Sequence, residues 1–292
     1  MSNILLSICV PSFNRATKLN RLINSIDLVE GIELVVCDDG SSDNTKNVIN
    51  NNKSKIKFIY EYQENQGRGF ALKKAIQMST GKYIIVMDSD DYFIPEALSN
   101  ICWVLSTQKL YKSFVFGIKI FNKNNYIENL PPDIKSNYIS LRGDYGVKND
   151  LKEVVRSDIL KSSLYSDSVS CRRVPTFLIW ASVAEKTSCL SISMAVAVKE
   201  YLPGGMTSKG FLLRMECATP MSELYSRLAH STTYKSMYYR WLMRVMWARY
   251  AFHAKQIRYN SLWMIIVILP SFVIYTADKL ILLNFFYRKN DG

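Results

Sequence analysis

The stretch from Tyr83 to Asp91 constrains this chain more than any other. Its first five residues are apolar or aromatic and partly β-branched, which is typical of a strand buried on both faces of a sheet. Three carboxylates, Asp88, Asp90 and Asp91, then follow within four residues. Open α/β sheets bind ligands where their strands end, and a divalent cation relieves the repulsion between closely spaced acids. The stretch therefore predicts a metal–diphosphate site. The competing interpretation is a solvated acidic turn that caps the next helix.

The chain before this stretch alternates between strand and helix patterns. Apolar runs typical of strands cover Ile4–Val10, Ile32–Cys37, Ile56–Tyr60 and Tyr83–Met87. Between them, helical spacing and capping residues predict helices over Arg15–Leu28, from about Asp43 to Asn51, and over Phe70–Met78. This β-α-β-α-β-α-β pattern predicts a parallel sheet with helices on both faces. The segments after the strands then share one edge of the sheet, which a chance acidic turn would not require: Pro11–Arg15, Asp38–Asp43, Glu64–Arg68 and Asp88–Asp91.

The pattern weakens beyond Pro95. Apolar spacing predicts helices over Ala97–Leu105, Asp150–Leu160 and Thr176–Lys186, and strands over Phe114–Phe121 and Ser191–Tyr201. We find no internal repeat.

Charge and cysteine content limit the classes of partner and compartment. The formal net charge of +12 indicates an anionic partner, which could be nucleic acid, a phosphorylated substrate or anionic lipid. The two histidines argue against a histidine-centred site. The six cysteines include no C-x-x-C pair, so we predict buried thiols such as Cys9 and Cys37 in a reducing compartment, not a disulfide framework. Because Ile4–Val10 runs straight into Pro11, no secretory signal is recognised and a cytoplasmic location is favoured.

Three motifs occur in a characteristic order along the chain: Val10-Pro11-Ser12-Phe13-Asn14-Arg15, then Cys37-Asp38-Asp39-Gly40-Ser41-Ser42-Asp43, then Met87-Asp88-Ser89-Asp90-Asp91 followed by Pro95. Together they resemble the family-two glycosyltransferases with the GT-A fold. The usual family pattern is V-P-x-Y/F-N, then V-D-D-G-S-x-D, then L-D-S-D-D. The resemblance covers residues 1–120 well. It is looser over Gly143–Ser208, where short segments resemble bacterial polysaccharide and O-antigen enzymes.

The resemblance implies a donor site. The implied nucleotide-sugar-binding residues are Pro11, Ser12, Phe13, Arg15, Asp38, Asp39, Arg68, Asp88 and Ser89. The implied ligands of a Mg²⁺ or Mn²⁺ ion are Asp88, Asp90 and Asp91. In this family the second Asp of D-D-G-S contacts the nucleotide base, which here is Asp39, and the D-x-D motif binds ribose and the metal that bridges the diphosphate. The competing interpretations are helix capping near Asp39 and a solvated loop position for Arg68.

The implied mechanism needs a general base, and here the sequence departs from the family. A carboxylate on the acceptor side would deprotonate the acceptor hydroxyl in a single inverting displacement. Related bacterial enzymes carry an acid in a P-E-x-x-x-W segment, where this chain has Thr176 before Trp180. Asp167 and Glu185 flank the segment and are candidate bases, and Asp144 is a poorer one. The competing interpretation is that each is an ordinary surface acid.

The C-terminal part becomes basic and aromatic from about residue 221. Over the next 40 residues, seven Lys and Arg stand against one acid, with Tyr and Trp interleaved. Such a segment could lie on anionic lipid, bind nucleic acid, or be the solvated face of packed helices. Leu262–Ala277 is almost wholly apolar, but it is shorter than the roughly 20 residues of a membrane span, and Pro270 interrupts it. We therefore predict a monotopic or re-entrant anchor over Leu262–Phe286.

These observations combine into one hypothesis. The expected fold is α/β, of GT-A type with a mostly parallel central sheet, plus C-terminal helices associated with a membrane. Residues 1–120 would bind the nucleotide sugar, residues 121–215 the acceptor, and residues 216–292 would form the basic C-terminal helices. The expected activity is inverting sugar transfer from a nucleotide-diphosphate donor, with a UDP-sugar as one candidate, to a saccharide or lipid-linked oligosaccharide. This reaction belongs to O-antigen or capsule synthesis at the cytoplasmic face of the cell membrane.

Two alternatives remain open. The chain could be a non-catalytic nucleotide-sugar-binding protein of polysaccharide assembly, because Thr176 stands where a base is expected. A nucleotidyltransferase is less favoured, because such sites use a Gly-rich, basic loop after the first strand, whereas this chain has Pro11-Ser12-Phe13.

Overall fold

The computed structural model describes residues 4–52, 56–121, 135–147, 150–166, 174–200, 214–230, 236–256 and 265–290, together with Leu130 and Cys171. Its strands are β1 (Leu6–Ser12), β2 (Ile32–Asp38), β3 (Lys57–Tyr62), β4 (Tyr83–Val86), β5 (Tyr92–Phe93), β6 (Ser113–Ile120), β7 (Lys135–Ser136), β8 (Lys152–Arg156) and β9 (Cys189–Lys199). Its helices are α1 (Ala16–Asn24), α2 (Thr45–Asn52), α3 (Arg68–Met78), α4 (Ala97–Thr107), α5 (Tyr138–Gly143), α6 (Ser157–Ser162), α7 (Phe177–Lys186), α9 (Ala218–His230), α10 (Met237–His253) and α11 (Ile265–Asn290).

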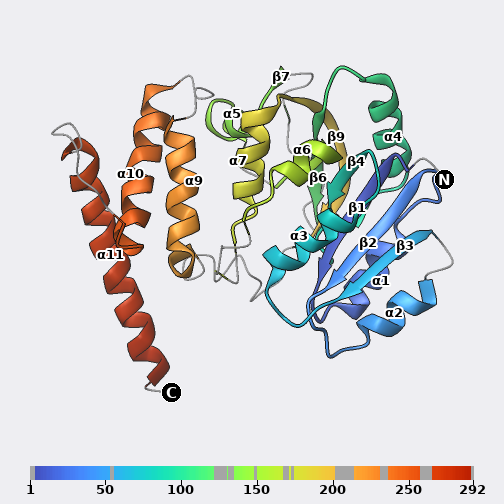
Figure 1. Cartoon of the computed structure of the whole chain (residues 1–292), viewed down its shortest axis with the longest axis horizontal. Coiled ribbons are helices and arrows are strands. Elements are labelled where there is room, and N and C mark those ends of the chain that lie inside the picture. The colour runs from blue at the N-terminus through green and yellow to red at the C-terminus, as the bar shows by residue number, and fades with distance from the viewer. Residues whose placement is uncertain are drawn as a thin grey trace.

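One mixed sheet lies at the centre of the part of the molecule that precedes the C-terminal helices (Figure 1). Its strands run in the order β3-β2-β1-β4-β8-β6-β9-β5, and β7 pairs with β9. Strands β3, β2, β1 and β4 run parallel to one another, as the sequence predicts. The register places Ser12 opposite Asp38 and Cys9 opposite Val86, so the carboxyl ends of β1, β2 and β4 lie at the same edge.

The second half of the sheet corrects one secondary-structure prediction. The predicted helix over Asp150–Leu160 is wrong: residues 152–156 form β8, and the helix α6 begins only at Ser157. Strand β8 runs antiparallel between β4 and β6, where Val154 and Val155 are fully buried on opposite faces. Because β8 enters the sheet from the opposite direction, its first residue, Lys152, lies near the edge where β4 ends.

Helices cover both faces of the sheet and enclose two separate cores. One core joins α1 and α4 to the sheet through residues such as Leu22 and Leu98. The other joins α3, α5 and α7 to it and extends to α9, through residues such as Ile76, Ile179 and Leu224. The successive segments therefore build a three-layer α/β body whose strands are buried from both sides.

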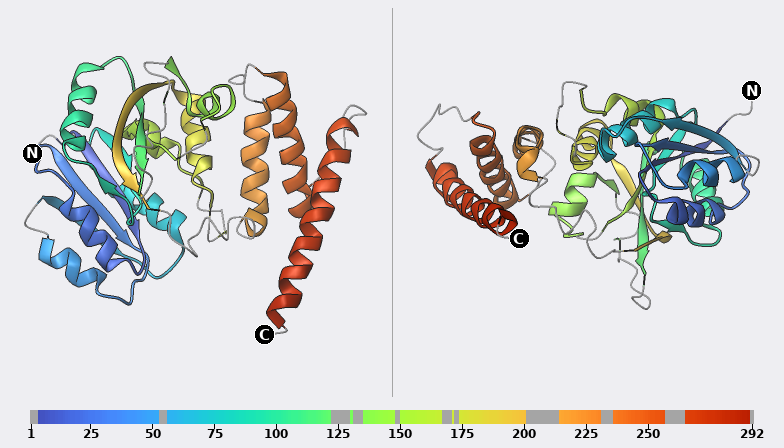
Figure 2. Two further views of the ribbon diagram at one scale, coloured as in Figure 1. Left: turned by 180° about the vertical axis from the view of Figure 1, so that it is seen from behind. Right: turned by 90° about the horizontal axis from the view of Figure 1, so that it is seen from below.

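The C-terminal helices α9, α10 and α11 form a row beside this body, with α11 outermost (Figures 1 and 2). Helix α11 is fixed to α10 by Asp278, which accepts two hydrogen bonds of 2.7 Å from Arg249 and lies 3.0 Å from the Nε2 of His253. No helix within the described ranges is long and apolar enough to cross a membrane.

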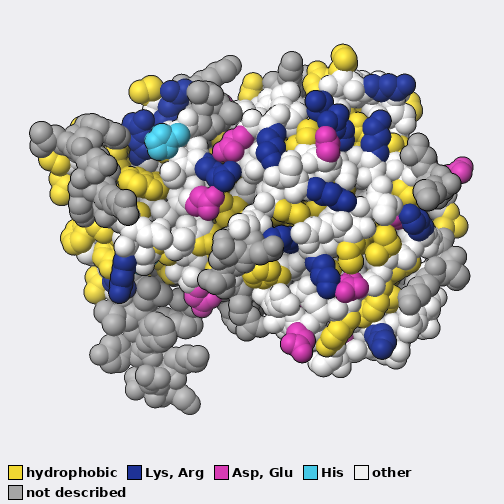
Figure 3. Space-filling view, viewed as in Figure 1, with side chains coloured by type: hydrophobic (Ala, Val, Ile, Leu, Met, Phe, Trp, Pro, Cys, Tyr) yellow, Lys and Arg dark blue, Asp and Glu magenta, His cyan; other side chains and the backbone are white. Residues whose placement is uncertain are grey.

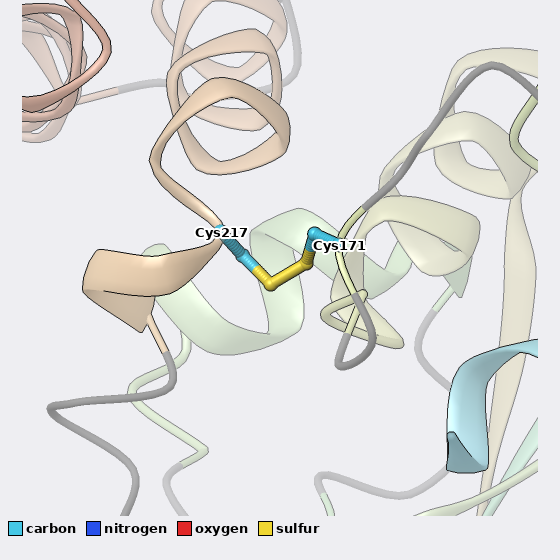
Figure 4. The surroundings of a disulfide bond; sticks show 2 residues. All are labelled: Cys171 and Cys217. Carbon is cyan, nitrogen blue, oxygen red and sulfur yellow. A yellow bond between two sulfur atoms is a disulfide. The ribbon is translucent and has the colours of Figure 1, made fainter. Parts of the chain in front are cut away.

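A disulfide corrects the prediction that the cysteines are all thiols. Cys171, before α7, is bonded to Cys217, beside the start of α9 (Figure 4). Cys9 and Cys37 are free and buried, as predicted, and burial raises the pKa of the Cys37 thiol to about 12. The two bonded residues are 46 positions apart and have no local sequence signal.

Candidate functional site

Hydrogen bonds join the loop after β1 to the loop after β2. The side chain of Asn14 accepts bonds from the backbone N–H groups of Ser42 and Asp43, at 2.8 and 3.3 Å. The backbone N–H of Asn14 in turn donates to the Ser41 hydroxyl at 2.9 Å. Asn14 has a φ of +50°, a conformation that Asn tolerates better than most residues. The first two motifs are therefore held together as one unit at the sheet edge.

Two of the three acids of the second motif, Asp38 and Asp39, fix the backbone around the ends of β2 and β3. Asp39 is buried and accepts bonds from the Gln63 side chain and from the backbone N–H groups of Gln66 and Gly67, at 2.7 to 2.9 Å. Asp38 is also buried, and its carboxylate accepts bonds from the Tyr60 hydroxyl and the Ser41 N–H. Both acids thus anchor backbone that surrounds the predicted base-binding position.

Gly40 is required at the centre of this motif. Its φ is +83°, and a Cβ built at this position would lie 2.9 Å from the backbone nitrogen of Asn65. A side chain would therefore strain the turn and push the loop after β3 away from it.

Asp88 is held between two cations from distant parts of the chain. Arg68, at the start of α3, donates to it through Nε at 3.0 Å and also through a second guanidinium nitrogen. The ammonium of Lys199, at the end of β9, lies 3.4 Å from its other oxygen. Burial alone would raise the pKa of Asp88, but Arg68 and Lys199 hold it well below its ordinary value. Asp88 therefore remains ionised.

Arg68 also contacts the residue that replaces the expected acid. Its third nitrogen donates to the Thr176 hydroxyl at 2.8 Å. Thr176 precedes α7, so a single guanidinium joins the D-x-D segment to the start of α7. Thr176 supplies no carboxylate at this position.

The remaining acids of the third motif have different environments. The Asp90 carboxylate makes no hydrogen bond or ion pair with any described residue, although its backbone carbonyl accepts a 2.6 Å bond from Arg21. Asp91, by contrast, is fully buried, and the Lys152 ammonium lies 2.5 Å from its Oδ2. The other oxygen of Asp91, Oδ1, is buried without a hydrogen-bond partner among the described residues. The part of Asp91 in the predicted metal set therefore stays a prediction, and its pair with Lys152 fixes its place in the turn.

The other predicted donor-site residues lie around the same edge. Pro11 and Ser12 end β1, and the buried Ser12 hydroxyl has no hydrogen-bond partner among the described residues. Phe13 exposes 46% of its surface beside them, and the exposed Arg15 precedes the first residue of α1. Ser89 is buried within the turn after β4.

The three candidate bases lie in different parts of the chain. Asp167 lies outside the described residues. Glu185 lies near the far end of α7 from Thr176, about 13 Å along the helix axis at 1.5 Å per residue. Its carboxylate is 3.3 Å from Arg227 of α9. Asp144 follows the end of α5. The geometry gives no support to Glu185 as the base.

Residues 7–138 match the sequence profile of glycosyl transferase family 2. This segment is a family 2 glycosyltransferase domain. The chain resembles two Escherichia coli proteins named as UDP-Glc:alpha-D-GlcNAc-diphosphoundecaprenol beta-1,3-glucosyltransferases. One is WfgD, 31% identical over 152 residues, which are 50% of this chain and 58% of the relative. The other is WfaP, 29% identical over 126 residues, which are 42% of this chain and 47% of the relative. The chain thus spans about half the length of these relatives.

Solved structures show that the family 2 domain has the GT-A fold, as predicted. Staphylococcus aureus TarS 1–349 superposes with a TM-score of 0.66 at 15% identity, covering 94% of this chain and 80% of that chain. The same protein in complex with UDP-GlcNAc gives a TM-score of 0.64. Glucosyl-3-phosphoglycerate synthase of Mycobacterium tuberculosis, in complex with Mg²⁺ and UDP, gives 0.51 at 18% identity over 77% of this chain.

The carboxylates at this edge supply only part of a coordination shell for a divalent cation. No group of three or more Asp, Glu, His or Cys side chains in the described residues is arranged to hold a metal alone. However, Asp90 offers an unpaired carboxylate beside Asp88, and Mg²⁺ commonly uses one or two carboxylates together with substrate phosphates and water. The site therefore suits a metal that arrives with a diphosphate.

Sequence reasoning missed two residues at this edge, both of which lie beyond the segment that matches the family 2 profile. Lys199 lies 3.0 Å from Asp150 as well as 3.4 Å from Asp88, so one ammonium links the two carboxylates. Asp150 exposes 51% of its side chain. Neither residue belongs to a recognisable motif. Only the antiparallel entry of β8 and the length of β9 bring them to the edge where β4 ends.

Proposed function

We propose that this chain is an inverting glycosyltransferase that moves a sugar from a nucleotide-diphosphate donor to a saccharide or lipid-linked oligosaccharide acceptor. One observation carries the proposal: the loops after β1, β2 and β4 bring Ser12, Asp39 and Asp88–Asp90 to one edge of the sheet. The family 2 profile and the E. coli relatives support the reaction class and a role in surface-polysaccharide synthesis.

The donor would lie across this edge. The loops fixed by Asp38 and Asp39 would surround the base, and the exposed ring of Phe13 offers it an apolar surface. Arg68 and Lys199 would face the diphosphate, because they are the cations nearest to the D-x-D acids. A UDP-sugar is the donor we favour, in keeping with the UDP-Glc named for the E. coli relatives and the UDP-GlcNAc bound to TarS.

Asp90, assisted by Asp88, would hold Mg²⁺ or Mn²⁺ against the donor phosphates. When bound, such an ion supplies Lewis-acid neutralisation of the leaving nucleoside diphosphate. Arg68 and Lys199 add fixed positive charge at the same place. The buried pair of Asp91 and Lys152 stabilises the turn after β4.

Asp150 is the base that the geometry favours. Among the described carboxylates at this edge, Asp88 is paired with two cations and Asp91 is buried, while Asp150 exposes half of its side chain. Burial raises the pKa of Asp150, but Lys199 more than offsets this and holds it below its ordinary value. Asp150 is therefore ionised at neutral pH and able to accept a proton from an acceptor hydroxyl.

The names of the relatives support a proposal for the acceptor and the cellular site. The names of the E. coli enzymes specify a diphosphoundecaprenol-linked sugar, which is a membrane lipid. We therefore place this chain at an anionic membrane surface, on its cytoplasmic face, where nucleotide sugars are available.

A second function is favoured by the Arg68–Thr176 contact. Because the expected acid is replaced by Thr176, the chain could bind a nucleotide sugar without transferring it. Such a protein would bind the donor as tightly as an enzyme and release no nucleoside diphosphate.

Calorimetry of UDP binding with and without Mn²⁺ tests the donor site. We expect Mn²⁺-dependent binding that weakens at least about tenfold in Asp90→Asn. Asp158→Asn is the matched control, because Asp158 is an exposed acid after β8, paired only with Arg156 in the described structure. Equal affinities in the wild type and Asp90→Asn would refute the proposed site.

Turnover separates the two functions. Release of UDP from a panel of UDP-sugars, with a synthetic lipid-linked acceptor, is expected for the wild type. Asp150→Asn should abolish this release while leaving UDP affinity within about twofold. A wild type that binds UDP-sugars but releases no UDP with any acceptor would favour the binding protein.

A further inference from the structure

The outer face of α11 is a continuous apolar surface. Seven large apolar side chains of this helix each expose between 49% and 67% of their surface. We call them the α11 outer face: Ile265, Ile266, Leu269, Phe272, Val273, Leu280 and Ile281. Their spacing places them on one side of a helix with 3.6 residues per turn. Thr276, Ala277 and Lys279, which lie between Val273 and Leu280, are also exposed, and Lys279 alone of these three is charged.

The opposite side of α11 is fixed on α10. Val267 and Ser271 are buried there, and the Ser271 hydroxyl donates to the backbone carbonyl of Val245 at 2.9 Å. Asp278, on the same side, is buried between Arg249 and His253. These contacts set the rotation of α11 about its own axis. The apolar residues therefore face outward because of specific polar contacts on the inner side.

The size of this face calls for a partner. The α11 outer face runs for about 24 Å along the helix at 1.5 Å per residue. Helix α11 is the outermost element of the row, on the side away from the sheet, and apolar side chains gather at that border of the molecule (Figures 2 and 3). Monomeric soluble proteins rarely expose contiguous apolar surfaces of this kind, except where they bind another surface.

Charge selects the kind of partner. From residue 236 to residue 290 the sequence has eight Lys and Arg residues and one acid, Asp278. That acid is already paired with Arg249, so it neutralises none of the other cations. A second copy of this chain would bring the same excess of positive charge to the contact, which disfavours self-association. An anionic surface with an apolar layer beneath its charges satisfies both features.

We propose that α11 lies in the interface of an anionic lipid bilayer, with its outer face buried among the headgroups and upper acyl chains. The choice of lipid over an acidic protein rests on the proposed function, because the acceptor named for the relatives is itself a membrane lipid. Aromatic residues of α10, among them the exposed Tyr238, would lie at headgroup level. The helix binds along the surface, as monotopic amphipathic helices do.

Vesicle co-sedimentation tests this proposal on the full chain. The probes are vesicles of phosphatidylcholine alone and of phosphatidylcholine with phosphatidylglycerol. We expect binding to the anionic vesicles that weakens in 0.5 M salt, because screening removes the attraction of the exposed cations. Leu269→Gln combined with Val273→Gln should weaken this binding at least tenfold. Both side chains are exposed, so the thermal unfolding of the variant should match that of the wild type.

A matched pair elsewhere controls for loss of apolar surface. Leu28 and Leu110 are also strongly exposed but lie outside the C-terminal helices. Leu28→Gln combined with Leu110→Gln should leave vesicle binding unchanged. Equal weakening in both double variants would overturn the assignment to α11. Wild-type chain that stays in the supernatant with both kinds of vesicle would overturn the proposal itself.

Two further measurements separate the remaining outcomes. Sedimentation velocity that shows a dimer in the wild type and a monomer in Leu269→Gln/Val273→Gln, without vesicle binding, would identify a second copy as the occupant and refute the lipid proposal. Calorimetry of UDP binding should be unaffected in this variant. Vesicle binding without UDP binding would remove the proposed function but keep the membrane face, and the reverse result would remove the membrane face alone.

Discussion

The buried pair of Lys152 and Asp91 makes the sharpest prediction about stability. The two side chains expose 6% and 1% of their surface, and the ammonium lies 2.5 Å from Oδ2 of Asp91. The other oxygen, Oδ1, is buried without a hydrogen-bond partner. Lys152→Met keeps most of the side-chain volume and removes the charge, so it leaves the Asp91 carboxylate buried and unpaired. Removing one partner of a buried ion pair costs roughly 3–5 kcal/mol of unfolding free energy.

The cost should depend on pH. Burial raises the pKa of Asp91 above its ordinary value although Lys152 opposes this, and the loss of Lys152 should raise it further. A carboxyl group with a raised pKa in the folded state stabilises that state fully below its unfolded pKa, and this contribution is lost as pH rises through the folded pKa. Lys152→Met should therefore be closer to the wild type at pH 5 than at pH 8.

Thermal and urea unfolding measure the effect. At roughly 2–4 °C per kcal/mol, Lys152→Met should lower Tm by roughly 6–20 °C at pH 8. Adding Asp91→Asn removes the unpaired charge and should restore most of the loss. Lys74→Met is the control, since the Lys74–Glu61 pair is exposed and worth about 1 kcal/mol or less.

The reasoning would be refuted by a loss below about 1 kcal/mol in Lys152→Met at both pH values, since a buried pair cannot be broken at so small a cost. It would also be refuted if Asp91→Asn weakened Mn²⁺-dependent UDP binding as strongly as Asp90→Asn. That result would support Asp91 as a metal ligand.

Three other predictions address single positions. Gly40→Ala should lower the free energy of unfolding by about 1–3 kcal/mol and weaken UDP binding, because its Cβ would lie 2.9 Å from the Asn65 nitrogen; urea titration and calorimetry measure both. Burial raises the pKa of Glu153 from 4.5 to about 7. Its contribution to the free energy of unfolding is therefore fully present below pH 4.5 and is lost as pH rises through 7. Between pH 5 and pH 8, the free energy of unfolding of Glu153→Gln should therefore rise by up to about 3 kcal/mol relative to that of the wild type. Urea titrations in which this difference between variant and wild type stays constant with pH would contradict the prediction. Lys199→Met should weaken UDP binding about tenfold in calorimetry while Lys199→Arg keeps most of it, and equal affinities of both variants would exclude a role for this charge at the diphosphate.

The first half of the fold was predictable because its signals are local. Strands β1, β2 and β4 are mostly apolar runs buried on both faces, which is typical of inner strands, whereas β3 is half-buried and forms the edge of the sheet. The right-handed connections of parallel strands then place the loops at one edge. The convergence of Asp39 with Asp88 follows from this topology without any side-chain detail.

The features that the sequence could not reveal depend on contacts between distant residues. The apolar pattern around Val154 and Val155 is too short to distinguish a helix from a strand. The segment forms a strand because it pairs with both β4 and β6. Spacing groups Asp91 with Asp88 and Asp90 but could not predict its ion pair with Lys152, 61 residues away. Asp150 and Lys199 could not be identified because no motif marks either of them.

The bond between Cys171 and Cys217 gives the molecule a mechanical property. It shortens the covalent route from the segment before α7 to the beginning of α9, bypassing the 46 positions that separate them along the backbone. While it is intact, the start of α9 stays tethered to Cys171, six positions before the helix α7 that begins beside the Arg68–Thr176 contact. Reducing agents would loosen this linkage, so vesicle-bound orientation and nucleotide affinity should be coupled only in the oxidised chain.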